Sequence, residues 1–212
     1  MTSDAHDRDA WEQRWEQVLR DHPDKLVSRP PSDLLVDVAR ELRPGRALDA
    51  GCGHGAEAIW LAAAGWTVTA VDFSRAALEH GQATAQGFDP DVAARIAWVE
   101  GDLGAWTPDE GYFDLVSCLY VHVAGPLGSV GEMVSRLAAG VAPDGTLLLV
   151  GHRPVDPATG EPTPAASQVQ VSVEEALEVL DPQEWEIQVA EERPRAVLGS
   201  GVDAVVRAVR QR

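Results

Sequence analysis

A glycine-rich segment followed by an acidic residue is the part of this sequence whose residue types and spacing best suit ligand binding. Residues 48–55 read Leu-Asp-Ala-Gly-Cys-Gly-His-Gly, and Asp72 stands at the end of the next apolar run. A glycine turn between a strand and a helix lets a ligand approach the backbone closely. A carboxylate about 20 residues further on can accept hydrogen bonds from both hydroxyls of a ribose. The pattern therefore predicts a cofactor that contains a nucleoside.

The glycine pattern alone leaves two classes of cofactor open. Residues 51–56 match G-x-G-x-x-A, a pattern that dinucleotide-binding proteins also contain. Asp49 lies just before the first glycine, where a carboxylate suits a cationic ligand better than a pyrophosphate. A second acidic site, Asp102, follows the third predicted strand. These carboxylates disfavour a nicotinamide-dependent oxidoreductase or a non-catalytic nucleotide-binding module, which stay as the alternatives.

Strands and helices alternate around this segment. Apolar runs predict five strands, over residues 46–50, 67–71, 96–100, 113–119 and 146–151. Helices are predicted between them over residues 57–64, 74–86 and 127–141, and Pro143-Asp144-Gly145 predicts a tight turn before the fifth strand. Strands that are apolar almost throughout and separated by helices predict a parallel sheet with helices on both faces.

The last third of the chain departs from this alternation. Residues 153–167 predict a loop, and Ser172 can cap a short helix that extends to Leu180. Two further strands, over residues 184–191 and 203–210, follow with no helix between them. Because parallel neighbours need a crossover connection, these two strands predict an antiparallel hairpin at the edge of the sheet.

Two helices are predicted before the first strand. Trp11, Trp15 and Val18 lie on one face of a helix over residues 8–21, and a second helix begins at Ser32. We expect residues 1–45 to form a helical cap or lid packed on residues 46–212, the whole forming one structural domain. The tryptophans are expected to pack in the core rather than around a substrate.

Composition disfavours several classes of function. The formal net charge of −17 repels nucleic acids and anionic membranes. No apolar run approaches the roughly 20 residues that span a bilayer, and the first residues are polar and acidic, unlike a secretory signal. Two cysteines make neither a disulfide framework nor a four-ligand zinc site. We expect a cytoplasmic protein without a metal, a monomer or homodimer, that binds a small molecule and no nucleic acid.

Five motifs in order resemble those of the class I S-adenosylmethionine-dependent methyltransferases. They are the segments Leu48–Gly55, Val71–Ser74, Gly101–Leu103, Phe113–Val116 and Pro143–Leu147. The resemblance extends from Arg46 to Arg210. It implies an α/β, Rossmann-like, doubly wound fold in three α/β/α layers, with a seven-stranded sheet of order 3-2-1-4-5-7-6 and strand 7 antiparallel.

The resemblance also implies an activity. The protein would transfer a methyl group from S-adenosyl-L-methionine to a small-molecule acceptor (a thiol or chalcogen, a hydroxyl or an amine) and release S-adenosyl-L-homocysteine. The tryptophan-containing stretch near the N-terminus, Trp11-Glu12-Gln13-Arg14-Trp15, and the short chain also resemble the tellurite-resistance and thiopurine methyltransferase branch.

Roles in cofactor binding follow from the resemblance, position by position. Gly51, Cys52 and Gly53 would pass under the methionyl part of the cofactor. Asp49 would help to hold its ammonium group, and Asp72 would accept hydrogen bonds from both ribose hydroxyls.

The remaining cofactor contacts come from three other strand ends. Asp102 would accept a hydrogen bond from the adenine amino group, and the Leu103 amide would donate to the adenine ring. Phe73 would pack on the adenine face. The carbonyl groups of Cys118 and Leu119 would face the ammonium group.

Candidates for the acceptor site follow the fourth and fifth strands. Ligands of open α/β sheets bind beyond the carboxyl ends of the strands, where Tyr120, His122 and His152 stand. His122 is the first candidate for a general base, because a neutral imidazole can take a proton near pH 7. Arg153 is expected to form an ordinary ion pair, and His54 to cap the turn or face solvent. A thiol or an ionised acceptor would need no base at all.

Overall fold

Seven strands form one sheet in the computed structural model, which describes residues 12, 13, 15, 17, 20, 21, 29–122, 130–153, 170–194 and 201–212. The strands are β1 Arg46–Ala50, β2 Thr67–Asp72, β3 Ile96–Glu100, β4 Phe113–Leu119, β5 Val141–His152, β6 Trp185–Pro194 and β7 Val202–Arg210. Their order is β3-β2-β1-β4-β5-β7-β6, and β7 is antiparallel to both of its neighbours. This confirms the predicted strand order and the antiparallel edge. The chain divides into two compact units, residues 1–106 and 107–212.

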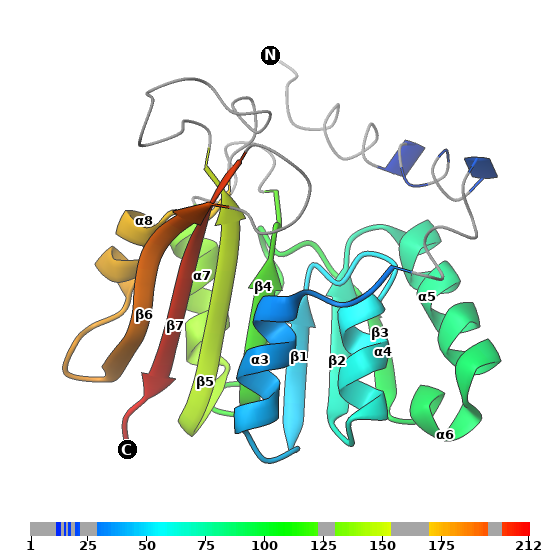
Figure 1. Ribbon diagram of the computed structural model, residues 1–212, viewed down its shortest axis with the longest axis horizontal. Coiled ribbons are helices and arrows are strands. Elements are labelled where there is room, and N and C mark those ends of the chain that lie inside the picture. The colour runs from blue at the N-terminus through cyan, green and yellow to red at the C-terminus, as the bar shows by residue number, and fades with distance from the viewer. Residues whose placement is uncertain are drawn as a thin grey trace. The chain divides into compact units, whose positions relative to one another are not determined.

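The first unit contains three parallel strands and the helices that precede and follow them in the chain (Figure 1). Its helices are α3 Asp33–Glu41, α4 Ala56–Ala63, α5 Arg75–Phe88 and α6 Pro90–Ala93. Helix α4 packs against all three strands, and α5 packs against β2 and β3. The parallel register sets Ala50 opposite Val71 and Asp72 opposite Glu100, so the three carboxyl ends lie at one edge.

Local sequence explains where the helices of this unit begin. The Ser74 hydroxyl accepts a hydrogen bond from the Ala77 N–H at 3.2 Å, as its position before α5 predicts. Gly55 precedes α4 with a φ of 82°, in the left-handed region that favours glycine. Helix α6 was not predicted, because its four residues are too few to show a helical period. Asp89 caps it by accepting from the Asp91 N–H at 2.8 Å.

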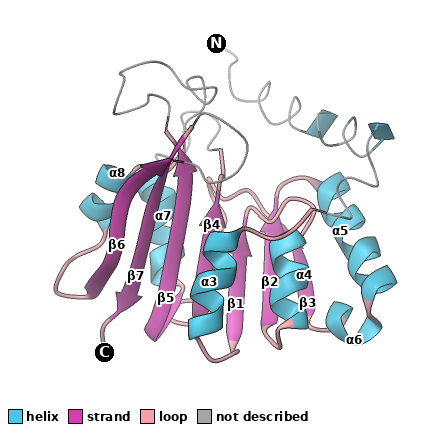
Figure 2. Cartoon of the chain, viewed as in Figure 1, coloured by secondary structure: helices cyan, strands magenta, loops and turns pink. Residues whose placement is uncertain are grey.

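The second unit pairs β4 with β5 in parallel and places β7 between β5 and β6. Its helices are α7 Val130–Ala139 and α8 Val173–Val179, which pack against each other (Figure 2). Ser172 and Glu175 form a capping box at α8: the Ser172 hydroxyl accepts from the Glu175 N–H at 3.1 Å, and the Ser172 N–H donates to the Glu175 carboxylate at 3.3 Å.

The start of β5 differs most from the expectation, and β6 ends at Pro194 rather than at Glu191. Strand β5 begins at Val141, so the predicted turn at residues 143–145 lies within the strand as an irregularity. The pairing register of β4 with β5 shifts between Phe113 and Leu115, and Asp144 has a φ of 63°. A Cβ atom on Gly145 would lie 2.8 Å from the Ala142 carbonyl oxygen, so glycine fits this bend.

Part of the predicted N-terminal cap lies outside the described residues, Trp11 and Val18 among them. The described positions of the first predicted helix are all helical; they are Glu12, Gln13, Trp15, Gln17, Arg20 and Asp21. The division into a cap over residues 1–45 and a domain over residues 46–212 stays a prediction. Over the described ranges, no helix has both the length and the apolar character needed to cross a membrane.

Candidate active site

The glycine turn, residues 51–55, is fixed onto the end of β2 by backbone hydrogen bonds. The N–H groups of Gly51 and Cys52 both donate to the Val71 carbonyl, at 2.7 and 3.0 Å. Gly51 and Gly53 have φ values of 77° and 52°, a conformation that side-chain-bearing residues adopt only with strain. At the end of β1 the turn is therefore held by its backbone rather than by its side chains.

Asp72 orients this turn from the neighbouring strand. One carboxylate oxygen accepts from the Gly53 N–H at 2.8 Å and the other from the Ser74 N–H at 2.9 Å. Asp72 is only 7% exposed, and this burial raises the pKa of its carboxyl while the two backbone N–H groups oppose the rise. Because each carboxylate oxygen has two lone pairs, both oxygens keep the capacity to accept from a ligand hydroxyl.

Carboxylates mark the ends of all three strands of the first unit. Asp49 is buried in β1, Asp72 ends β2, and Asp102 follows β3 in an exposed turn whose Gly104 N–H donates to it at 2.9 Å. Ionised carboxylates only accept hydrogen bonds. This set suits a ligand with hydroxyl and amino donors and positive charge, such as S-adenosylmethionine, and repels a pyrophosphate.

The neighbours of these carboxylates are apolar. Leu103 is buried, and Phe73 is half-buried directly after Asp72. In the second unit, Cys118 is buried and Leu119 is half-buried at the end of β4. Each of these residues lies at a strand end or just after one, as the sequence predicted.

The Cys52 side chain has no nucleophilic role in this arrangement. Its sulfur is buried and lies 3.7 Å from the Gly53 carbonyl oxygen. Burial, together with the negative charges of Asp49 and Asp72, raises the pKa of the thiol well above its usual value. The thiol therefore stays protonated near neutral pH.

Trp15 packs on the glycine turn. A Cβ atom placed on Gly53 would come within 3.0 Å of the Trp15 ring, and the ring centroids of Trp15 and His54 are 5.8 Å apart. Glu12 accepts a hydrogen bond from the Ala76 N–H, at the N-terminus of α5, at 3.2 Å. The described N-terminal residues thus contact the turn and α5, and movement of this segment as a lid stays a prediction.

His54 is not placed as its position in the turn suggested. Its side chain is 6% exposed and its buried Nε2 has no hydrogen-bond partner in the part of the chain that the structure describes. Burial, followed by the charges of Arg29 and His80, lowers the pKa of His54 to about 4. The expectation of a capping or solvated histidine was wrong, because the turn directs the ring inward.

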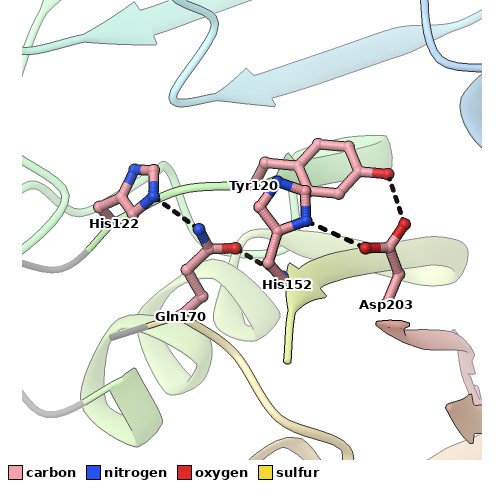
Figure 3. Close-up of polar contacts among 5 residues, drawn as sticks. All are labelled: Tyr120, His122, His152, Gln170 and Asp203. Atoms are coloured by element: carbon pink, nitrogen blue, oxygen red, sulfur yellow. Dashed lines mark hydrogen bonds and ion pairs between the residues drawn. The ribbon is translucent and has the colours of Figure 1, made fainter. Parts of the chain in front are cut away.

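A polar cluster of five side chains (Tyr120, His122, His152, Gln170 and Asp203) occupies the second unit (Figure 3). Asp203 is buried, with 3% exposure, at the start of β7. One of its oxygens lies 3.0 Å from His152 Nδ1, and the other accepts from the Tyr120 hydroxyl at 3.1 Å. The rings of Tyr120 and His152 are 4.3 Å apart. The carboxylate therefore holds two side chains that end β4 and β5.

Gln170 fixes the tautomer of His122. Its side-chain oxygen accepts from the His152 backbone N–H at 2.6 Å, so its amide N–H₂ faces His122 Nε2, also at 2.6 Å. An amide N–H₂ group only donates, so His122 Nε2 must accept. A neutral imidazole has one accepting nitrogen, so this bond engages the basic atom of His122.

His152 has the same tautomer as His122, but a different group fixes it. Its Nδ1 faces an acceptor-only carboxylate and therefore carries the hydrogen, which makes Nε2 the basic nitrogen. Tyr120 completes the arrangement with a φ of 58°, an uncommon conformation for a bulky side chain. Backbone strain of this kind costs about 1–3 kcal/mol and is concentrated at functional sites.

Comparison with known proteins matches a family model described as a methyltransferase domain to residues 47–145. Residues 47–145 therefore resemble a methyltransferase domain, over slightly less than half of the chain. The crystal structure of TehB from Haemophilus influenzae shares its fold, with a TM-score of 0.71 at 18% identity over 92% of this chain and 66% of that chain.

Curated relatives of this chain differ in the share of their own length that the chain covers. Release factor glutamine methyltransferase of Bordetella pertussis is 38% identical over 44% of this chain and 36% of that protein. Thiocyanate methyltransferase 1 of Arabidopsis thaliana is 29% identical over 88% of this chain and 78% of that protein. The chain spans less than half the length of the first curated relatives that it matches.

Sequence reasoning found three members of the polar cluster and missed two. Tyr120, His122 and His152 lie together as their positions after β4 and β5 suggested. Asp203 and Gln170 were not predicted, although Asp203 pairs directly with His152 in the β5–β7 register. Arg153 forms ion pairs with Glu192 and Glu174, which confirms the expected ordinary role.

Proposed function

We propose that this chain is an S-adenosyl-L-methionine-dependent methyltransferase that methylates a small-molecule acceptor. The observation that carries the proposal is the geometry of Asp72, whose carboxylate is oriented by the N–H groups of Gly53 and Ser74 at the end of β2. Further support comes from the relatives, which are named as methyltransferases. A nicotinamide cofactor is disfavoured by the carboxylates at the strand ends.

The residues of the first unit would hold the cofactor. Asp72 would accept from the ribose hydroxyls, Asp102 and the Leu103 N–H would bind the adenine edge, and Phe73 would pack on its face. The ammonium group would be held by Asp49. When bound, the cofactor supplies a methyl group on a positively charged sulfur, which is already activated toward displacement.

Two backbone stretches would complete this cofactor site. Gly51, Cys52 and Gly53 would lie against the methionyl chain, because their conformation keeps side chains out of its path. The carbonyl groups of Cys118 and Leu119 would interact with the ammonium group. Because the activated methyl needs only an aligned nucleophile, these residues would act mainly by positioning.

The polar cluster would deprotonate the acceptor. His152 Nε2 would take the proton of an acceptor O–H or N–H as the new bond to the methyl carbon forms and the carbon–sulfur bond breaks. Asp203 would stabilise the resulting imidazolium, since the two groups already share a hydrogen bond. Tyr120 would position the same carboxylate. His122, which Gln170 holds by a hydrogen bond, would bind or orient the acceptor. This assignment favours His152 over His122 as the base.

A histidine paired with a carboxylate indicates the class of acceptor. Thiols and other soft nucleophiles ionise or react without a strong base, whereas a hydroxyl needs its proton removed. We therefore propose a hydroxyl-bearing acceptor first, and a thiol or chalcogen, the acceptor class implied by the tellurite-resistance and thiopurine branch, second. Two relatives are named as O-methyltransferases of ubiquinone biosynthesis. The negative net charge supports an acceptor other than a nucleic acid.

Thermal-shift titration with S-adenosylmethionine, S-adenosylhomocysteine and NAD tests the cofactor. A ligand at about 100 times its dissociation constant adds roughly 2.7 kcal/mol of stability, which raises the unfolding midpoint by a few degrees. We expect the rise with the two adenosyl ligands only. A rise with NAD alone would overturn the proposal.

Release of S-adenosylhomocysteine then tests catalysis and the acceptor class. We would measure it with matched phenols, aliphatic alcohols, thiols and amines. Turnover with hydroxyl compounds that falls in His152→Gln supports the proposed base. Turnover only with thiols, unchanged in His152→Gln, would remove the base from the mechanism and leave the cofactor assignment intact.

A further inference from the structure

A cavity of about 710 Å³ lies along helices α4 and α5 of the first unit. Its wall is mostly apolar and includes Pro31, Ile59, Trp60 and Phe88. It contains none of the residues assigned to the cofactor: Asp49, Asp72, Asp102 and their neighbours are not among its lining residues. The cavity is therefore a separate feature that the proposed methyl transfer does not use.

Two histidine nitrogens in this cavity are buried without hydrogen bonds. His54 and His80 both line it, and the Nε2 atom of each lacks a hydrogen-bond partner among the described residues. Leaving a buried polar atom unpaired costs about 1–3 kcal/mol, so native proteins do so rarely. At a cavity wall, the missing partner can come from a ligand.

The charge at the cavity has the opposite sign to that of the whole chain. Arg29 lines the same cavity as the two histidines. Burial, followed by interaction with Arg29 and His80, lowers the pKa of His54, and burial also lowers the pKa of His80. Near neutral pH, Arg29 is therefore the charged member of this cluster and the two imidazoles are neutral. In a chain with a net charge of −17, this cluster offers a local site for an anion.

The apolar part of the cavity opens to solvent at Phe88. This side chain is 65% exposed at the C-terminal end of α5, and it is one of the few large apolar side chains exposed on the described surface. Exposed apolar groups next to a cavity mark sites where the apolar part of a ligand is covered. The cavity thus combines an apolar wall with a polar cluster of donors.

We infer that this cavity binds a small organic anion, a carboxylate carried on an apolar body. Arg29 and the imidazole N–H groups of His54 and His80 would bind the carboxylate, and Ile59, Trp60 and Phe88 would cover the apolar body. The inference does not depend on the proposed methyl transfer. It assigns the chain a second ligand site, formed partly by a residue of the glycine turn.

Calorimetric titration of the full chain with octanoate tests this site, with octanamide as the uncharged comparison. We expect octanoate to bind about tenfold or more tightly than octanamide, since a hydrogen bond to a charged group contributes about 1.5–3 kcal/mol. Arg29→Gln and His80→Gln should each weaken octanoate binding by a similar factor. Arg75→Gln is the matched control, because Arg75 is an exposed arginine of α5 that pairs with Glu79 outside the cavity.

Nitrogen-15 spectra of the histidine rings locate the binding. Octanoate should shift the ring resonances of His54 and His80 and leave those of His122 and His152 unchanged. Equal affinity for octanoate and octanamide would overturn the inference, as would shifts at His122 or His152 only. Because both substituted side chains are partly exposed, the variants should keep the unfolding midpoint of the parent, and that midpoint is measured first.

Discussion

The glycine turn and the polar cluster are each organised by a buried carboxylate, but its hydrogen-bond partners differ: backbone groups in the turn and side chains in the cluster. In the turn, backbone N–H groups make the decisive contacts, and the carboxylate that orients it lies 19 residues away from Gly53. In the cluster, side chains make the contacts, and Tyr120 and Asp203 are 83 residues apart. The first region therefore depends on backbone conformation, and the second depends on the chemistry of each side chain.

This difference has a consequence for substitution. In the turn, the protonated thiol of Cys52 is buried, so its side chain offers no reactive group and the backbone makes the contacts. A residue of the cluster cannot change its donors or acceptors without reversing a hydrogen bond. The predictions below compare the two regions in this respect.

Asp203→Asn should have the largest effect. An amide N–H₂ facing His152 Nδ1 would favour the wrong tautomer and would not stabilise the imidazolium. We expect kcat to fall by about 10²–10⁴-fold while the affinity for S-adenosylmethionine stays within twofold. Steady-state kinetics and calorimetry measure the two quantities. Asp109→Asn, at an exposed position of the same unit, is the control, and an unchanged kcat in Asp203→Asn would refute the role of the dyad.

Asp72→Ala should produce the opposite pattern. Loss of the acceptor for both ribose hydroxyls should weaken S-adenosylmethionine binding by about 100-fold or more. The hydrogen bonds of the polar cluster should persist, which the ring resonances of His122 and His152 report. If cofactor affinity in this variant equals that of the parent protein, the cofactor does not contact Asp72, and the comparison of the two regions fails.

The pH dependence of stability tests whether His54, a titrating side chain of the glycine turn, contributes to the free energy of unfolding. The pKa of His54 is lowered to about 4, so between pH 6.5 and pH 4 the unfolded chain binds a proton that the folded chain does not. Stability should therefore fall as the pH falls through this window. Relative to the parent, His54→Gln should lose about 3 kcal/mol of this dependence, measured by urea unfolding at several pH values. Parallel pH profiles for parent and variant would contradict it.

Gly53→Ala should have a smaller effect, on stability. Its φ of 52° is costly for alanine by roughly 1–2 kcal/mol, and the added methyl would press on the Trp15 ring at 3.0 Å. Gly87→Ala is the matched control, because a Cβ atom there meets nothing within 4 Å in helix α5. That control should be neutral or stabilising by up to about 1 kcal/mol. Equal midpoints for the two variants would mean that the turn tolerates a side chain.

The same contrast explains what could be predicted from the sequence. The strands of the first unit and the glycine turn follow from local patterns of apolar residues, glycine and aspartate, and their placement matched at almost every boundary. Asp203 and Gln170 could not be found in this way, because their partners depend on the register of β5 with β7 and on the path of the chain before α8. No local pattern encodes that register.

His54 shows a second reason for failure. Its position in the turn was correct, but the direction of its ring was not, since the direction depends on φ values at three neighbouring glycines. The irregular start of β5 has a similar origin: Pro143-Asp144-Gly145 has the composition of a turn, yet pairing with β4 keeps it within the strand.

The position of β7 in the sheet has a consequence for how the protein is made. A ribosome completes β7 after β4, β5 and β6, yet β7 lies between β5 and β6. Until β7 is synthesised, β5 and β6 therefore each have an unpaired edge, and unpaired strand edges promote aggregation. Asp203, near the start of β7, emerges in the same interval. The second unit thus gains the strand that joins β5 to β6, and the buried carboxylate beside His152, in a single late step of biogenesis.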